Sequence, residues 1–233
     1  MRRAVGVLGE LLLTLGGLVL LFVVWQLLWT DVVSDRAQAR TVTSLEQDFA
    51  DATRDPAGAT ATRIGGDAFA VVRIPRFGRD YERPLVEGTS AAELARGLGH
   101  YVGTAGPGEV GNFAIAGHRT TYGKPLAEIA SLRPGDEVIV ETVAGESVYA
   151  VRSHTIVRPW ESEVIAPVPG DRAAKPTKAM LTLTSCHPRF SAKQRYVVHA
   201  ELVRTRTREQ LSLVDDLPAP ATPPTPAPTT APS

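Results

Sequence analysis

Apolar residues dominate a long run near the start of the chain, from Leu11 to Trp29, which has no charged residue and only Thr14 and Gln26 as clearly polar ones. A helix of about 20 apolar residues crosses the ~30 Å hydrocarbon core of a bilayer, so this run predicts a transmembrane helix. Arg2 and Arg3 precede the run, and Asp31 follows it. Because cationic flanks stay in the cytoplasm, we expect the N-terminus inside and the chain after Asp31 outside.

A cleaved signal peptide is the competing interpretation of this run. The segment Ala37-Gln38-Ala39 matches the small-x-small pattern of a cleavage site. However, the apolar region of a signal peptide is usually about 7–15 residues long, and this run is longer. We favour an uncleaved anchor, and both interpretations place the main domain outside the cytoplasm.

The remaining chain divides by its pattern into three parts. Residues 31–64 are polar and rich in Ala and Thr, which predicts a stalk or linker after the anchor of residues 1–30. Residues 65–207 contain short β-rich runs with turn signals between them, the pattern of a single folded domain. Residues 208–233 end almost wholly in Pro, Ala and Thr, which predicts a disordered tail.

The β-rich runs of the domain are short and numerous, which favours a barrel or sandwich. We expect strands at Ala68–Ile74, Asn112–Ala116, Glu137–Val143, Ser147–Thr155, Ala179–Thr184 and Arg195–Val203. Two segments have helical spacing instead. Ala91–Arg96 follows a Thr or Ser cap, and Lys124–Leu132 ends at Pro134-Gly135.

The net charge and the cysteine count limit the classes of function that the chain can have. The formal net charge is zero, so nothing in the charge balance indicates a nucleic-acid partner. Cys186 is the single cysteine, which excludes an intramolecular disulfide. In a secreted protein such a cysteine is either an intermolecular link or a reactive thiol.

Three chemically active residues lie at strand ends: His118, Cys186 and Arg195. Strand ends at one rim of a barrel can converge although they are far apart in sequence. A thiol reacts as its thiolate, which a nearby cation stabilises. A histidine can pass protons to and from amines, and the rigid cationic fork of arginine can steady an oxyanion.

Other residues compete for these roles. His187 is adjacent to the cysteine, but successive strand residues point to opposite faces, so it is poorly placed. Arg189 and Arg204 are the alternatives to Arg195. A metal-binding module using Cys186, His187 and His118 also stays open, although structural zinc normally needs four nitrogen or sulfur ligands.

The segment Thr182-Leu183-Thr184-Ser185-Cys186 resembles the Thr-Leu-x-Thr-Cys signature of sortases, with Ser185 in place of Thr. The segments from Ala116 to Gly123 and from Cys186 to Tyr196 are similar to the class E branch of high-GC Gram-positive bacteria. The resemblance covers roughly Ala68 to Val203. It implies a mostly β fold: a closed antiparallel sortase-type β-barrel with short helices, preceded by the transmembrane helix.

The same resemblance implies a membrane-anchored, extracytoplasmic cysteine transpeptidase of the cell wall. In such enzymes Cys186 would be the nucleophile, His118 the general acid and base, and Arg195 the stabiliser of the substrate carbonyl or oxyanion. The nucleophile would cleave a C-terminal LAXTG or LPXTG sorting signal of a secreted protein between Thr and Gly. An amine of a peptidoglycan precursor of the lipid II type would then resolve the thioacyl-enzyme.

By the same likeness, Tyr122, Thr120 and Thr184 would line the peptide groove, and Tyr122 would favour LAXTG signals. We see no dense carboxylate cluster, so we expect no metal and no cofactor. Two alternatives stay open beside the transpeptidase. One is a hydrolytic cysteine peptidase, and the other is a catalytically inactive cell-surface binding module.

Overall fold

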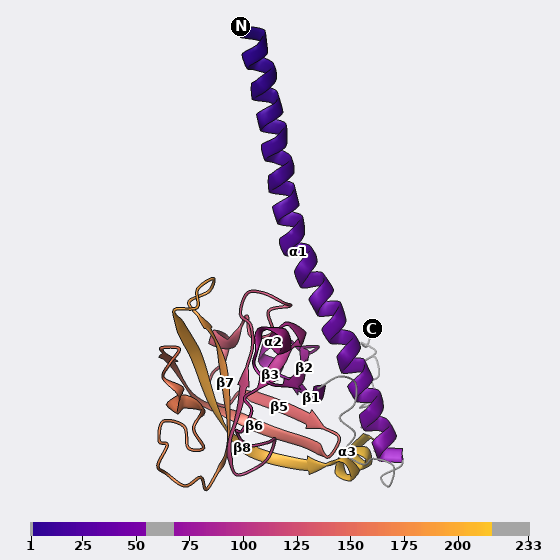
Figure 1. Ribbon diagram of the computed structural model, residues 1–233. Helices are drawn as coiled ribbons and strands as arrows, with labels where there is room; N and C mark the ends of the chain where they lie inside the picture. Colours follow the sequence, from indigo (N-terminus) through magenta and orange to yellow (C-terminus); the bar gives the residue numbers. More distant parts are fainter. Residues whose placement is uncertain (1, 55–67, 216–233) are drawn as a thin grey trace, which may run out of the picture.

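The computed structural model describes residues 2–54 and 68–215, in which a long helix stands beside a β-barrel (Figure 1). The strands are β1 (Ala68–Arg73), β2 (Glu82–Glu87), β3 (Leu98–His100), β4 (Gly111–Ala116), β5 (Glu137–Thr142), β6 (Gly145–Val157), β7 (Ala179–His187) and β8 (Gln194–Thr207). The α-helices are α1 (Arg2–Arg54), α2 (Ala91–Arg96) and α3 (Arg208–Asp215). Short 3₁₀ turns are η1 (Pro75–Phe77), η2 (Ile129–Ser131) and η3 (Ser162–Ile165).

The eight strands close into one barrel in the order β1-β2-β3-β4-β7-β8-β6-β5. This confirms the predicted closed β-barrel. The pairing is antiparallel except between β2 and β3 and between β4 and β7, which are parallel. The barrel is therefore mostly antiparallel, as the resemblance implied, with two parallel pairs. The parallel pair matters for function because it brings the ends of β4 and β7 to the same rim.

Alternation along β7 separates a core face from an outer face. Leu181 and Leu183 are fully buried in the barrel core. Because neighbouring side chains on a strand point to opposite sides, Thr182, Thr184 and Cys186 share the outer face. The nucleophile predicted from the sequence therefore lies outside the packed interior, at the end of a rigid strand.

The helix expected at Lys124–Leu132 was wrong, because this segment forms turns with only the short η2 helix. Its apolar residues Leu126, Ile129 and Leu132 are nevertheless buried in the core. Their spacing of three residues suits a 3₁₀ turn, which has three residues per turn, better than an α-helix. The short helix α2 was predicted correctly, and Ser90 caps it with Glu93 in a capping box.

Helix α1 continues without interruption from the apolar run into the segment that we expected to be a stalk. Gln38, Val42, Leu45 and Phe49 are buried on one face of this second half. All four recur at helical spacing. Val42, Leu45 and Phe49 pack against a patch of β1 and β2. The expected stalk, within residues 31–54, is thus a helix attached to the barrel, and residues 55–64 lie outside the described residues.

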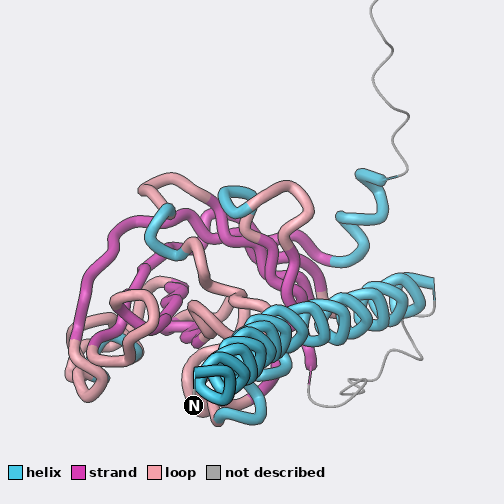
Figure 2. Tube along the Cα trace, turned by 90° about the horizontal axis from the view of Figure 1, so that it is seen from above, coloured by secondary structure: helices cyan, strands magenta, loops and turns pink. Residues whose placement is uncertain are grey.

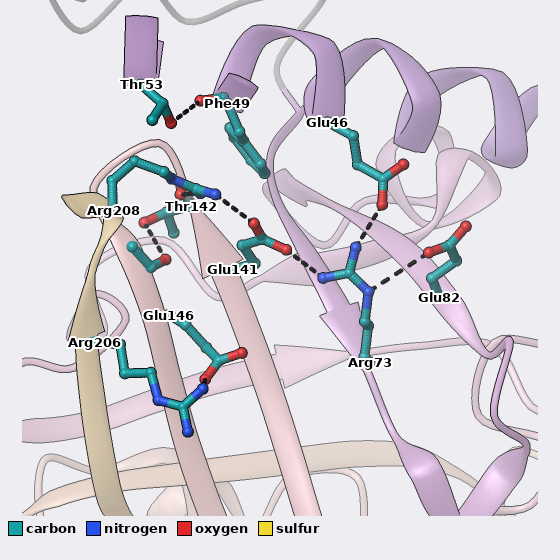
Figure 3. A network of polar contacts seen from close by, with 11 residues as sticks. Glu46, Phe49, Thr53, Arg73, Glu82, Glu141, Thr142, Glu146, Arg206 and Arg208 are labelled. Atoms are coloured by element: carbon teal, nitrogen blue, oxygen red, sulfur yellow. Dashed lines mark hydrogen bonds and ion pairs between the residues drawn. The ribbon is translucent and has the colours of Figure 1, made fainter. Parts of the chain in front are cut away.

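A network of ion pairs fixes the end of α1 to the barrel (Figure 3). Arg73 of β1 is bonded to Glu46 of α1 at 2.5 Å and also to Glu141 of β5. Arg208 pairs with the other oxygen of Glu141 at 2.6 Å and lies over the ring of Phe49, 4.9 Å from its centroid. Burial raises the pKa of Glu141, but hydrogen bonds from the two arginines outweigh it and lower that pKa overall.

These contacts also change the expectation for the C-terminal segment. Residues 208–215, predicted as the start of a disordered tail, form α3 against α1 and the ends of β6 and β8. The hydrogen bonds and stacking of Arg208 fix the first turn of this helix. The remaining tail, residues 216–233, lies outside the described residues.

Candidate functional site

Cys186 lies at the rim where β7 ends and is a free, partly exposed thiol. In the antiparallel register of β7 and β8 it stands directly opposite Arg195. Residues in such a pair have Cβ atoms about 4.5–5.5 Å apart, within reach of a long side chain. The strand register alone therefore places a permanent cation beside the thiol.

His118 reaches the same rim through the parallel pair of β4 and β7. Ala116 is in register with Thr184, and the Gly117 amide donates to the Thr184 carbonyl at 3.1 Å. The Ser185 hydroxyl then donates to the Gly117 carbonyl at 2.8 Å. The chain segment that carries His118 is thus bonded to the segment that carries Cys186. The sequence predicted that the two would meet, and the structure brings their strand ends together.

The imidazole of His118 is partly buried against Tyr122, with ring centroids 5.1 Å apart. Burial lowers the pKa of His118, because desolvation disfavours the charged ring. Its Nε2 is buried and makes no hydrogen bond within the part of the chain that the structure describes. A neutral imidazole at neutral pH can accept the proton of a thiol.

The guanidinium of Arg195 is held at the hairpin between β7 and β8. Its Nη1 donates to the carbonyls of Ala192 and Gln194, both at 3.0 Å. These two bonds anchor one nitrogen of the fork to the backbone. A cation held in this way can offer its remaining donors to a developing oxyanion with little loss of conformational freedom.

Arg119 is a site residue that the sequence analysis missed. It is buried, with 7% of its surface exposed, and its Nη1 donates to the Cys186 carbonyl at 3.2 Å. The same nitrogen lies 3.0 Å from Nδ1 of His187, and the guanidinium stacks over Tyr196 at 5.6 Å. Arg119 therefore ties the residue after the predicted base to the backbone of the predicted nucleophile. Its one sequence signal is its position beside His118.

The turn that carries Tyr122 is strained and firmly held. Tyr122, Gly123 and Lys124 all have positive φ, at 52°, 75° and 49°. Such runs persist only where the surroundings enforce them. Here Gln38 of α1 donates to the Tyr122 carbonyl at 2.9 Å, and Lys124 pairs with Asp31 of α1 at 2.5 Å.

The other residues predicted to line a groove lie near this rim. Thr184 is buried on the outer face of β7, and its hydroxyl is 2.9 Å from the hydroxyl of Tyr101. Thr120 is half-buried two residues after His118. Tyr122 is 39% exposed. All three share the rim or the outer face with Cys186.

The competing residues have other partners. His187 faces away from the thiol side of β7, toward Arg119 and the ring of Tyr196. Arg189 pairs with Glu128 at 2.7 Å. Arg204 is in register with Val148, many residues up β8 from the rim. Among the described residues, no group of three His, Cys, Asp or Glu side chains gathers as metal ligands would.

A cavity of about 620 Å³ opens on the same outer face, under the loop between β6 and β7. Val157 of β6 lines it and is in register with Arg195, which in turn is opposite Cys186. The other apolar lining residues include Val164, Val168 and Met180. The cavity therefore begins one strand away from the proposed oxyanion-stabilising cation.

The part of the chain that forms the barrel matches a known protein family. Residues 72–203 match the sortase domain family. The chain is 36% identical to sortase SrtE1 of Streptomyces coelicolor, in an alignment covering 87% of this chain and 58% of that protein. The chain thus spans less than two thirds of the length of that relative.

Solved structures are similar too. Sortase E from Streptomyces avermitilis is 40% identical with a TM-score of 0.56, covering 62% of this chain and 93% of that chain. Sortase E1 from Streptomyces coelicolor, solved with a tripeptide in its active site, is 37% identical with a TM-score of 0.57. That match covers 62% of this chain and 93% of the other.

Proposed function

The chain belongs to the sortase family of cysteine transpeptidases, and we propose that it joins secreted proteins to a cell-wall amine, with Cys186 as nucleophile. Its similarity to sortase E proteins confirms the class E resemblance. One observation carries the proposal: a thiol, a cation and an imidazole come from three strand ends of a single rim. The proposed catalytic residues are Cys186, His118 and Arg195.

The first half-reaction uses all three residues. His118 takes the thiol proton, and the Cys186 thiolate attacks the carbonyl carbon of the substrate threonine. Arg195 donates to the resulting oxyanion, which lowers the barrier to attack. The C–N bond to glycine then breaks, and the leaving amine takes the proton held by His118. A thioacyl-enzyme remains on Cys186.

The second half-reaction reverses these roles. An acceptor amine attacks the thioester carbonyl while His118 takes its proton, and a new amide bond forms as the C–S bond breaks. The proton then returns to the departing Cys186 thiolate. A peptidoglycan precursor of the lipid II type, as predicted from the resemblance, would supply this amine.

The outer face of the barrel suits an extended peptide. The rim offers Tyr122 and Thr120 beside His118, and Thr184 is buried on the outer face of β7. The cavity lined by Val157 and Met180 can accept the apolar residue of an LAXTG or LPXTG signal. The related sortase E1 holds a tripeptide in its active site, which supports a peptide substrate for the same face here.

The membrane anchor is part of the same proposal. The apolar window Val5–Val23 of α1 has a mean hydropathy of 2.2 and none of it is buried in the described structure, which is compatible with a single membrane span. Arg2 and Arg3 precede this window. By the positive-inside bias the barrel would lie outside the cytoplasm, where sorting signals are exposed.

The test uses the full chain in detergent with a Leu-Ala-x-Thr-Gly peptide and a soluble amine. Mass spectrometry should detect a threonine–amine product and a thioacyl adduct on Cys186. Both should vanish in Cys186→Ala. Hydrolysis without the amide product, at saturating amine, would favour the cysteine peptidase. A folded chain that neither cleaves nor forms an adduct with LAXTG and LPXTG peptides would leave the binding module as the better interpretation.

A further inference from the structure

Helix α1 leaves the barrel at the rim that carries the proposed active site. Asp31 of α1 contacts Gly123 and Lys124 in the turn after β4, at this rim. Further along α1, Phe49 meets Arg208, which follows the far end of β8. The helix thus runs the length of the barrel, and its apolar half projects beyond the rim that bears Cys186. Figure 1 shows this course, and in Figure 2, seen from above, α1 again lies along one side of the barrel.

The distance from this rim to the apolar window is short. Asp31 comes eight residues after Val23, the end of the window. At 1.5 Å per residue the helix advances only about 12 Å between them. The headgroup region extends roughly 5–8 Å beyond the hydrocarbon core on each side. If α1 spans the membrane, the rim therefore lies only about 4–7 Å beyond the outer edge of the headgroups.

Exposed aromatic side chains gather at the same rim. Among the described residues after α1, the exposed Phe, Tyr and Trp side chains are Tyr122, Trp160 and Phe190. Trp160 is 71% exposed and follows the end of β6, whose Val157 is in register with Arg195. Phe190 is 88% exposed in the hairpin between β7 and β8. This hairpin lies at the end of the barrel from which α1 projects (Figure 1).

We propose that this aromatic rim, Trp160 and Phe190, is a membrane-contacting surface that docks on the outer leaflet around α1. Aromatic side chains are favoured at the boundary between headgroups and hydrocarbon. Arg158 lies over the ring of Trp160, 5.6 Å from its centroid, so a cation that suits anionic headgroups accompanies the aromatic. Docking holds the active site against the bilayer instead of turning it toward the outer solution.

The docked arrangement has a consequence for the acceptor. It rests on the proposed function and the proposed anchor. With the rim at the headgroups, an amine carried on a lipid reaches the thioacyl group on Cys186 by lateral diffusion in the leaflet. A lipid-linked acceptor is then favoured over a free amine of the same chemistry because its local concentration at the rim is higher.

Measuring how deeply position 190 lies in the membrane tests the docking without an activity assay. The full chain carrying Cys186→Ala receives a single new cysteine, Phe190→Cys, for an environment-sensitive dye. The chain is placed in vesicles of phosphatidylcholine and phosphatidylglycerol. Lipids with a nitroxide on the headgroup should quench this dye strongly. Val110→Cys is the matched control, because Val110 is 60% exposed just before β4, at the opposite end of the barrel.

The outcomes separate the docking from the anchor. Flotation of the vesicles first shows whether the chain is membrane-bound, and a chain that does not float overturns both the anchor and the docking. Strong quenching at position 190 with little at 110 supports the docking. Equal quenching at both positions, or none at 190 in a chain that floats, overturns the docking and leaves the anchor standing.

A second measurement distinguishes contact of this surface with the membrane from contact with the sorting peptide. The double variant Trp160→Ser, Phe190→Ser should lower the transfer rate to a vesicle-bound lipid amine by about fivefold. Its rate with a soluble amine in detergent should match that of the unmodified chain, as should both rates of Val110→Ser. An equal fall with both amines would mean that these aromatics contact the sorting peptide, and would overturn the proposal.

Discussion

Arg119 shows how one buried side chain can set the geometry of two others. Its guanidinium satisfies the Cys186 carbonyl while its backbone adjoins His118. A buried carbonyl that loses its donor costs about 1–3 kcal/mol. The strand end is therefore expected to shift when this donor is removed. Because Arg119 acts through the Cys186 backbone, we regard it as a positioning residue.

Arg119→Met should lower kcat/KM for the sorting peptide by about 10- to 100-fold, as 1.4 kcal/mol of barrier corresponds to tenfold in rate. The loss should lie in kcat. The pH dependence of the rate at which Cys186 is alkylated should also change. Steady-state kinetics and iodoacetamide labelling measure both. Arg189→Met is the matched control, because its exposed pair with Glu128 contributes little. Equal effects of the two substitutions would contradict the positioning role.

The two partly buried imidazoles of His118 and His199 predict a specific loss of stability in mild acid. Burial lowers the pKa of His118 and that of His199. Below about pH 6.5 the unfolded chain therefore binds protons that the folded chain does not. The stability contributed by the neutral rings is complete above that pH and is lost as the pH falls toward their folded pKa values.

Urea unfolding between about pH 7.5 and pH 5.5 measures this loss, in a range above the ordinary titration of carboxylates. The slope of unfolding free energy against pH is at most about 1.4 kcal/mol per pH unit for each histidine. The double variant His118→Gln, His199→Gln should flatten the slope in this range. An unchanged slope would mean that burial of these rings does not govern the acid response.

At the scale of elements, the turn after β4 and helix α1 depend on each other. Gly123 has φ +75°, and a Cβ built there would lie 2.6 Å from an Asp35 carboxylate oxygen of α1. That carboxylate pairs with Arg83 at 3.1 Å. A side chain at position 123 must therefore push the helix away or move the turn that follows His118.

Gly123→Ala should lower both stability and kcat/KM. The left-handed backbone alone costs an alanine about 1–2 kcal/mol, and the contact with Asp35 adds to it. Gly135→Ala is the matched control, because Gly135 has φ +92° but no atom within 4 Å of its Cβ. The control should lose stability only. Thermal unfolding and peptide cleavage assays compare them, and full activity of Gly123→Ala would show that the turn does not position His118.

At the scale of the whole molecule, local patterns predicted many short strands in a barrel or sandwich, and the resemblance to sortases implied the closed barrel. Alternating apolar residues mark the strands, and strand ends are where side chains such as Cys186 become accessible. Long-range pairing was not predictable in the same way. The sequence analysis did not single out Arg119, because its burial depends on the parallel pairing of β4 with β7. The spacing of Leu45 and Phe49 is that of one helix face, but spacing alone cannot identify the surface that this face covers.

That covered surface leads to a prediction about how the chain can be shortened. Val42, Leu45 and Phe49 are almost fully buried against β1 and β2. Burying each such side chain contributes about 1.5–3 kcal/mol. A chain lacking residues 1–30 keeps this packing, whereas one lacking residues 1–64 exposes the apolar patch beneath it. Both lack the membrane span, so the comparison isolates the packed half of α1.

The shorter chain should unfold at a temperature at least about 5 °C lower, because each kcal/mol shifts Tm by roughly 2–4 °C in a domain of this size. Its cleavage rate should fall as well, since the turn after His118 loses Gln38 and Asp31 as partners. Calorimetry and peptide assays at one temperature measure both. Equal melting temperatures would show that α1 adds no stability to the barrel. A lower melting temperature with an unchanged rate would separate the helix from the active site and restrict its role to stability.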